Sequence, residues 1–300
     1  MAPEDDGPGD AHGEGRIVLV ATPIGNLGDL SPRAVAALAS ADVIACEDTR
    51  VTRKLLSHAG IAGRRLVALH AHNEAAVAPG LVAQAAGGAV VAVVTDAGMP
   101  GISDPGARLV VLAAAAGVAL DLVPGPSAVL TALVLSGQPT DRFAFDGFLP
   151  RKGGERAARL AAIAAEPRTV VLFESPHRVR ATVDNLVSAC GAERPVALAR
   201  ELTKLHQEVW RGCLGDAMVW LETAVPRGEF VIVVGPAAEV EAAPVDDASV
   251  RDALVSRLAA GDDRKAAVAA VTAALGVPRR RVYDAAVALR KSDGPPEVAR

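Results

Sequence analysis

The sequence predicts an α/β protein, with two α/β domains followed by a small helical domain. At 300 residues the chain is longer than a typical single domain, and a hydrophobic content of 51% supplies apolar surface for more than one core. Aromatic residues make up only 3% of the chain, so Ala, Val and Leu must build these cores. Such a composition favours helices packed on a parallel sheet over an aromatic-rich β-sandwich.

The chain begins with an acidic segment, residues 1–15. Its charged side chains are all carboxylates, namely Glu4, Asp5, Asp6, Asp10 and Glu14, and they alternate with several Gly and Pro. A segment with few apolar residues and one sign of charge cannot bury a core. We therefore expect this segment to be disordered.

The first α/β domain is predicted over residues 16–125, where short apolar runs alternate with Ala-rich helical stretches. The predicted strands are residues 16–21, 42–46, 65–69, 89–93 and 120–123. Two of the helices between them are residues 32–41 and 107–116. This alternation is typical of right-handed βαβ units, which produce a parallel sheet.

The second α/β domain is predicted over residues 126–236, with strands at 169–173, 195–199 and 230–234. Residues 237–248 contain acidic residues, Ala and Pro, but no Lys or Arg, which is typical of a linker.

The predicted helical tail covers residues 249–300, with helices at 249–260, 263–275 and 278–289. Asp262 or Asp263 is placed to cap the second helix, Gly276 to end it and Pro278 to start the third, an arrangement similar to a helix-turn-helix. The tail is rich in cations, namely Arg264, Lys265, Arg279, Arg280, Arg281, Arg290 and Lys291. These cations favour contact with phosphates, although the whole chain has a net charge of −4. The alternative is that the tail is a helical bundle whose charged side chains are simply solvated.

Three predicted strands end in loops rich in Gly and Pro: residues 22–29, 94–106 and 124–128. Since the carboxyl ends of parallel strands meet at one edge of a sheet, these loops predict one shared ligand crevice. None of the loops contains the G-x-x-x-x-G-K-[ST] or G-x-G-x-x-G pattern, so the sequence does not support a nucleoside triphosphatase or a dehydrogenase.

A series of motifs occurs in order along the chain. They are TPIGNL (22–27), EDTR (47–50), HNE (72–74), the Asp96 loop, PGPS (124–127), GFLP (147–150), ESPHR (174–178), ARELTK (199–204) and GEF (228–230). In this series the chain resembles the tetrapyrrole methylase superfamily, and within it the bacterial methyltransferases of small-subunit ribosomal RNA. The resemblance implies two α/β domains of tetrapyrrole methylase type with a cofactor cleft between them.

The resemblance implies S-adenosylmethionine as the cofactor. The residues that it assigns to cofactor binding are Pro23, Ile24, Gly25, Asp96, Gly98, Met99, Pro100, Ile102, Ser127 and Ala128. A sulfonium cation, an amine and a carboxylate need acceptors and rigid donors of the kind that these loops offer. For Asp104, which stands in the turn sequence Asp-Pro-Gly, a role as cap of its own turn is the favoured alternative.

The same resemblance implies methyl transfer to the ribose 2′-hydroxyl of a cytidine in 16S ribosomal RNA, in the decoding region of the small (30S) subunit. A ribose hydroxyl needs a base or a cation to become a good nucleophile, and the catalytic candidates are Glu174, His177, Glu201 and Lys204. Alignment of the reacting atoms, with no obligatory base, is an alternative. The predicted substrate-binding residues are Asn26, Asp48, Arg50, His72 and Asn73.

Two other functions remain open from the sequence: methylation of tetrapyrrole rings, and a non-catalytic RNA-binding module. The basic tail and the polar motifs argue against the first, and the intact cofactor loops argue against the second. The resemblance further suggests a homodimer.

The sequence gives little support for metal binding or for a membrane protein. His70 and His72 with Glu74 suggest a metal pair, but no further ligand has supporting spacing, so we expect no metal. The three cysteines form no C-x-x-C pair, and neither a signal peptide nor a membrane span is apparent. We expect a cytoplasmic protein.

Overall fold

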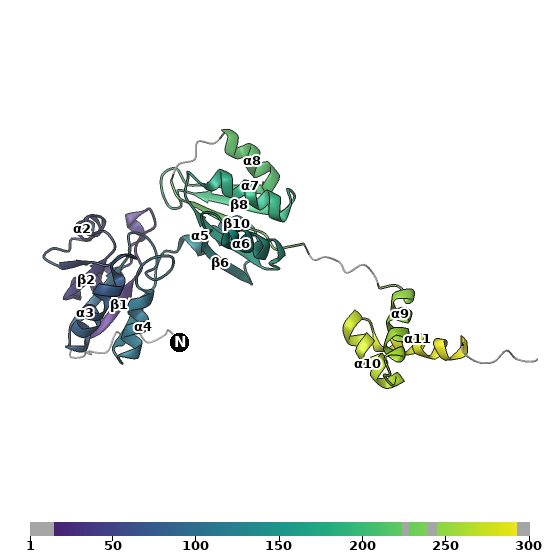
Figure 1. Cartoon of the computed structure of the whole chain (residues 1–300). Helices are drawn as coiled ribbons and strands as arrows, with labels where there is room; N and C mark the ends of the chain where they lie inside the picture. The colour runs from purple at the N-terminus through teal and green to yellow at the C-terminus, as the bar shows by residue number, and fades with distance from the viewer. Residues whose placement is uncertain (1–14, 224–227, 239–244, 293–300) are drawn as a thin grey trace, which may run out of the picture. The chain divides into compact units, whose positions relative to one another are not determined.

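The computed structural model describes residues 15–223, 228–238 and 245–292, with side chains as far as Leu289. The predicted acidic segment, apart from residue 15, lies outside the described residues. The part up to Ala238 forms one compact unit, and the part from Val245 onward forms a second (Figure 1).

The first sheet of the larger unit is fully parallel, with strand order β3-β2-β4-β1-β5. Its strands are β1 (Arg16–Val20), β2 (Val43–Cys46), β3 (Arg65–Ala68), β4 (Val90–Val94) and β5 (Ala119–Val123). Each lies within one or two residues of a predicted strand, which confirms the expected βαβ pattern. The strands β4, β1 and β5, which carry the three Gly- and Pro-rich loops, are adjacent.

Helices cover both faces of this sheet. One face packs against α3 (Glu74–Ala86) and α4 (Ala107–Ala115), and the other against α1 (Pro32–Ser40) and α2 (Thr49–His58). Because neighbouring strand residues point to opposite faces, Ile17 enters the first core and Val18 the second. Burial on both sides explains why these strands are continuous apolar runs in the sequence.

The second sheet is mixed, which corrects the parallel sheet that composition led us to expect. Its strands are β6 (Phe143–Phe148), β7 (Thr169–Glu174), β8 (Pro195–Arg200), β9 (Glu208–Cys213) and β10 (Phe230–Val234), in the order β6-β7-β10-β8-β9. Only β6 and β7 pair in parallel. The prediction missed β6, which contains Asp146 and Gly147, and β9, which is half exposed, because neither is a simple apolar run.

The helix α5 (Ala128–Ser136) covers one face of the second sheet. The helices α6 (Gly154–Ala165), α7 (Val179–Cys190) and α8 (Leu214–Thr223) cover the other. Ile24, from the loop after β1, packs against the α5 side of this core, so a loop of the first sheet contacts the core of the second. The division of this unit at residues 125 and 126 stays a prediction.

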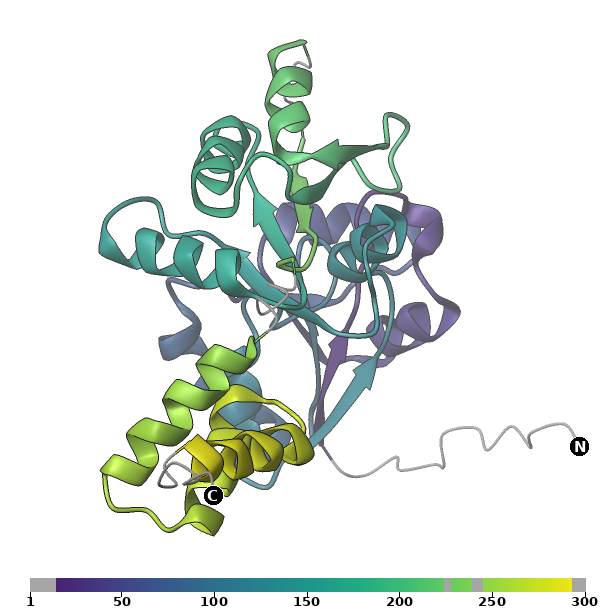
Figure 2. The same ribbon diagram turned by 90° about the vertical axis from the view of Figure 1, so that its right-hand side faces the viewer.

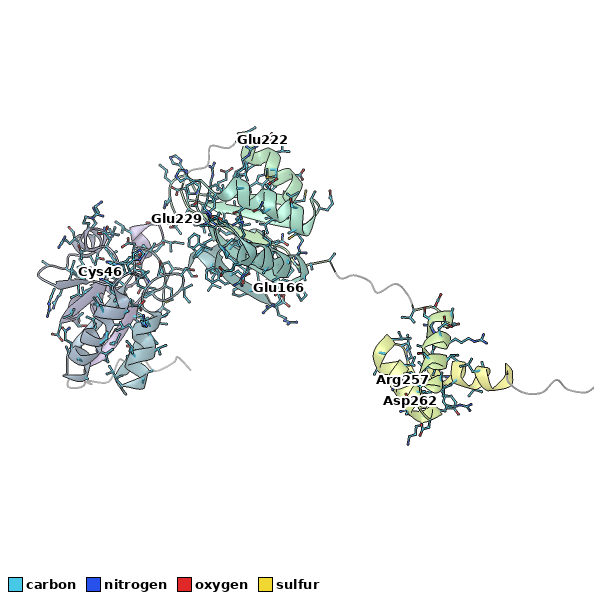
Figure 3. The ribbon with its side chains drawn as sticks, in the orientation of Figure 1. Cys46, Glu166, Glu222, Glu229, Arg257 and Asp262 are labelled. Atoms are coloured by element: carbon cyan, nitrogen blue, oxygen red, sulfur yellow. The ribbon has the colours of Figure 1, made fainter. Side chains whose placement is uncertain are left out.

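The second unit is a bundle of α9 (Asp247–Ala259), α10 (Arg264–Leu275) and α11 (Arg279–Ser292), which pack on one another (Figure 2). The helix α9 begins two residues earlier than predicted because Asp246 caps it, accepting from the Ser249 amide at 2.7 Å. Asp263 caps α10, while Asp262 pairs with Arg257 (Figure 3). Gly276 ends α10 in the left-handed conformation, as predicted. No helix within the described ranges has the length and apolarity needed to span a bilayer.

One buried cation joins three elements of the second sheet's layer. Arg194 is 7% exposed, and its guanidinium donates to four carbonyl oxygens: Gly235 at 2.7 Å, and Ile163, Ala164 and Glu166 at 3.3 Å each. These carbonyls lie at the ends of α6 and β10, and those of Ile163 and Glu166 also accept from the amides of Glu166 and Ala237. Burial lowers the pKa of Arg194, but its hydrogen bonds compensate for the lost solvation.

Substituting Arg194→Met should lower the free energy of unfolding by roughly 2 to 4 kcal/mol, because the Gly235 and Ala164 carbonyls lose their guanidinium donor. Urea unfolding followed by the fluorescence of Trp210 and Trp220, which stack at 5.8 Å in this half of the chain, measures the loss. Arg194→Lys, which keeps the charge but not the planar fork, should lose less. Identical urea midpoints for all three proteins would contradict this role.

Candidate functional site

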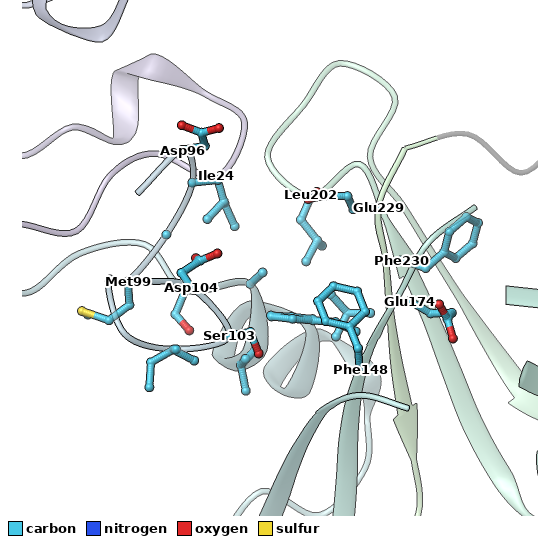
Figure 4. A pocket seen from close by; sticks show the side chains of 18 of the residues that line it. Ile24, Asp96, Met99, Ser103, Asp104, Phe148, Glu174, Leu202, Glu229 and Phe230 are labelled. Atoms are coloured by element: carbon cyan, nitrogen blue, oxygen red, sulfur yellow. The ribbon is translucent and has the colours of Figure 1, made fainter. Parts of the chain in front are cut away.

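A pocket of about 260 Å³ lies where the loops of the first sheet meet the second sheet (Figure 4). On the first side it is lined by Ile24, Glu47, Asp96, Ala97, Gly98, Met99, Ile102, Ser103 and Asp104. On the second side it is lined by Ser127, Ala128, Val129, Phe148, Phe173, Glu174, Glu201, Leu202, Lys204, Glu229, Phe230 and Val231. The crevice predicted at the carboxyl ends of β1, β4 and β5 is therefore present.

The loops after β1 and β4 are fastened to each other. Thr22 and Gly98 exchange backbone hydrogen bonds of 2.9 and 3.1 Å, and the Thr22 hydroxyl donates to the Thr95 carbonyl at 3.2 Å. Gly98 has a φ of 81°, a conformation in which glycine is strongly preferred. These contacts determine the shape of this side of the pocket.

The loop after β1 also locks against the loop after β8. The Asn26 amide donates to the Thr203 hydroxyl at 3.0 Å. A Cβ atom at Gly25 would lie 2.5 Å from Lys204 Cγ and 2.7 Å from the Leu202 carbonyl oxygen, so only glycine permits this approach. The first and second sides of the pocket are held together at this point.

Backbone strain is concentrated at the pocket. Among the described residues, the non-glycine residues with positive φ are Ser103 (61°), Glu201 (51°) and Thr203 (62°). Ser103 and Glu201 line the pocket, and Thr203 makes the contact with Asn26. Such conformations cost energy and persist where surrounding contacts enforce them, which is common at functional sites.

Two of the carboxylates that line the pocket are already engaged. Glu174 is 1% exposed and accepts from the Thr182 hydroxyl at 2.7 Å and the Ser175 amide at 2.8 Å, with Arg178 Nε at 3.4 Å. Glu201 forms an ion pair with Lys204, in which Lys204 Nζ lies 2.9 Å from Glu201 Oε1. Glu174 is therefore suited to hold β7 and α7 together rather than to exchange protons.

Asp104 is the carboxylate whose ionisation is most perturbed. Burial and the negative charges of Glu47, Glu229 and Asp96 raise its pKa to about 7. Burial also raises the pKa values of Asp96 and Glu47. Within the described part of the chain, the Asp104 carboxylate accepts no hydrogen bond from its own turn, so the turn-cap alternative is wrong.

The structure brings most of the predicted cofactor residues to the pocket: Ile24, Asp96, Gly98, Met99, Ile102, Ser127 and Ala128. Pro23, Gly25 and Pro100 stand in the same loops without lining it. Of the catalytic candidates, Glu174, Glu201 and Lys204 line the pocket, whereas His177 is exposed outside it.

The predicted substrate-binding residues all lie outside the pocket: Asn26, Asp48, Arg50, His72 and Asn73. Asp48 caps α2 and pairs with Arg50 at 2.6 Å, while its amide donates to Asp96 at 3.1 Å. Asn73 is held by the backbone of residues 68 and 70. Asp48 and Asn73 therefore have structural roles in this structure.

The metal alternative finds no support. Glu74 accepts from the amides of Gly106, Arg108 and Leu109 and so caps α4. The rings of His70 and His72 lie edge to face, 6.1 Å apart. No group of three or more potential ligands occurs within the described residues.

Sequence reasoning missed the aromatic side of the pocket. Phe148, Phe173, Glu229 and Phe230 line it, although nothing in their local pattern indicates a ligand. Phe148 and Glu229 belong to the motifs GFLP and GEF, which identified them as part of the resemblance but gave them no role.

Comparisons with known proteins agree with this architecture. The family model of the tetrapyrrole (corrin/porphyrin) methylases matches residues 16–218. A protein of Synechocystis sp. named ribosomal RNA small subunit methyltransferase I is 42% identical over 280 residues, 93% of this chain and 100% of the relative. A Mycobacterium tuberculosis protein of the same name is 47% identical over 285 residues, 94% of this chain and 98% of the relative.

Solved structures share the fold. The methyltransferase CobJ is similar with a TM-score of 0.57 and 26% identity, covering 77% of this chain and 98% of CobJ. A Thermus thermophilus uroporphyrin-III C-methyltransferase, solved with S-adenyl homocysteine, has a TM-score of 0.53 at 21% identity, covering 73% of this chain and 97% of that one. The family match, the relatives and the pocket between two α/β layers lead to one conclusion: the chain belongs to the tetrapyrrole methylase family.

Proposed function

We propose that this chain is an S-adenosylmethionine-dependent methyltransferase that modifies the ribose 2′-hydroxyl of a cytidine in 16S ribosomal RNA. The observation that carries the proposal is full-length similarity, at 42% and 47% identity, to proteins named ribosomal RNA small subunit methyltransferase I. The assignment of a cytidine 2′-hydroxyl as the methyl acceptor rests on the sequence resemblance.

The first side of the pocket fits the cofactor's charge. Asp96, Asp104 and Glu47 form an acidic lining, which complements a sulfonium cation and an ammonium group. Gly98, with a φ of 81°, lines the pocket without a side chain, so a ligand can approach the backbone closely there. S-adenosylmethionine bound at this side of the pocket would supply an electrophilic methyl group.

The second side supplies groups for the methyl acceptor. Lys204 lines the pocket and is held by Glu201, so its ammonium can stabilise the alkoxide that develops on a hydroxyl oxygen. As the oxygen–carbon bond forms and the carbon–sulfur bond breaks, the hydroxyl proton must leave. Asp104, with a pKa of about 7 and no hydrogen-bond partner among the described residues, is the carboxylate best suited to accept it.

We propose the remaining assignments from the resemblance. The substrate is the RNA of the small subunit or the 30S particle, in its decoding region, and the enzyme is a cytoplasmic homodimer. The basic helices α10 and α11 favour additional contact with RNA phosphates. Methylation of a tetrapyrrole ring is the second candidate, but the full-length relatives at 42% and 47% identity are named for ribosomal RNA.

The function is tested by incubating the protein with labelled S-adenosylmethionine and 30S subunits from cells that lack the endogenous enzyme. We expect one protected ribose near the decoding centre, detected by its resistance to alkaline cleavage. Label transferred to a porphyrinoid but not to subunits or their RNA would instead support the second candidate.

Cofactor binding should depend on pH through Asp104. Below about pH 7 this carboxyl is protonated and loses its attraction for a cation, so affinity for S-adenosylmethionine should fall by up to about tenfold from pH 8 to pH 6. Calorimetry without RNA measures this dependence. Asp104→Asn should bind more weakly at pH 8 and flatten the profile.

S-adenosylhomocysteine, which lacks the sulfonium charge, is the matched ligand control and should respond less to pH. Equal pH profiles for the wild type and Asp104→Asn would refute this role for the carboxylate.

The loop contact at Gly25 should be essential for activity. Gly25→Ala introduces a Cβ that overlaps Lys204 and Leu202, so the loop after β8 must move, and we expect methylation to fall by at least roughly tenfold. Gly80→Ala is the matched control, because Gly80 lies in α3 with open space around it and alanine favours helix. If Gly25→Ala kept full activity, the contact would not position the site.

A further inference from the structure

Three of the chain's five phenylalanines lie at one end of the second sheet, beside the pocket. Phe143, Phe145 and Phe148 are on β6, Phe173 is on β7 and Phe230 begins β10. Phe148, Phe173 and Phe230 line the pocket. In a chain with only 3% aromatic residues, this distribution concentrates planar side chains at the proposed active site.

A β-bulge turns Phe148 toward this cluster. The register between β6 and β7 shifts between Phe145 and Gly147, so that Phe145 pairs with Val171 and Phe148 with Phe173. Without the extra residue, strand alternation would place Phe145 and Phe148 on opposite faces of the sheet. The bulge and the positive φ of Gly147, 61°, aim the Phe148 ring at the same face as Phe173.

Phe148 is supported from one side and open on the other. Its ring centroid lies 5.6 Å from that of Phe173, which contacts Phe145 edge to face at 5.0 Å. Phe148 nevertheless remains 52% exposed and stands at the pocket (Figure 4). An aromatic face that is fixed by its neighbours and open to a pocket is suited to stack on a planar ring.

The charges beside Phe148 indicate that the planar ring stacked on it belongs to RNA and not to the cofactor. Arg151 and Lys152 follow it in an exposed turn, and neither is paired with a carboxylate among the described residues. S-adenosylmethionine contains no phosphate, whereas each nucleotide of an RNA strand has one. The acidic lining that suits the cofactor lies on the other side of the pocket, around Asp96 and Asp104 (Figure 4).

We infer that Phe148, supported by Phe173, is the stacking platform for the unpaired base of the methyl-acceptor nucleotide, with Arg151 and Lys152 contacting the adjoining phosphates. The inference rests on the proposed function and adds a subsite to it. Stacking on an aromatic ring recognises a base that is turned out of its helix, the usual target of sequence-specific RNA binding.

The test compares Phe148→Leu, which keeps apolar volume but removes the planar ring, with Phe148→Tyr, which keeps the ring. With 30S subunits as substrate, Phe148→Leu should raise KM about 5- to 150-fold, and Phe148→Tyr should stay near the wild type. Affinity for S-adenosylmethionine, measured by calorimetry without RNA, should be unchanged in both. Val219→Ala, at a 64% exposed apolar side chain on α8, is the matched control and should leave all values unchanged.

A second arm tests the cations. The double substitution Arg151→Ala with Lys152→Ala should weaken binding to 30S subunits and make its salt dependence less steep, because fewer phosphates are neutralised. Its affinity for S-adenosylmethionine should match that of the wild type.

Two results would overturn the inference. An unchanged KM in Phe148→Leu would show that no base stacks there, and a loss of S-adenosylmethionine affinity would assign the ring to the cofactor's adenine. Wild-type methylation of 30S subunits is measured first, so failure of the proposed function is seen separately, before any variant is compared.

Discussion

The pocket depends on the close contact between the loop after β1 and the loop after β8. Gly25 has no side chain, which lets the backbone of residues 202–204 approach it, and the Asn26 amide binds the Thr203 hydroxyl at 3.0 Å. The contact lies at the end of β1, a central strand of the parallel sheet, and at the end of β8 in the mixed sheet. It therefore positions Lys204 and Glu201 relative to the loops of the first sheet.

The two sides of the pocket differ in chemistry, and this difference suits a transfer between unlike partners. The first side has three carboxylates and no cation, and burial together with neighbouring negative charges raises the pKa of Asp104 to about 7. The second side also has three carboxylates, but Glu174 and Glu201 are paired with Arg178 and Lys204, and the exposed ring of Phe148 stands beside them. A cationic methyl donor is favoured by the first environment, and a nucleotide by the second.

Much of the fold could be predicted because local pattern dictates it. The strands of the first sheet are buried on both faces, so they stand out as apolar runs, and the caps Asp263 and Gly276 mark the ends of α10. The second sheet was harder to predict. Its antiparallel pairings come from the β8–β9 hairpin and from β10, which lies between β7 and β8. In addition, the bulge at Asp146 and Gly147 interrupts β6.

The sequence by itself determined the α/β class, the loops that meet at one sheet edge and the family, because these depend on residue type and order along the chain. Only the tertiary structure decided which of the candidates share the pocket. It shows that hydrogen bonds already occupy Glu174, that His177 is exposed outside the pocket, and that no described residue donates a hydrogen bond to the Asp104 carboxylate. Burial, the distances between charges and the orientation of rings depend on contacts between residues far apart in the chain. They therefore cannot be predicted from a local sequence pattern.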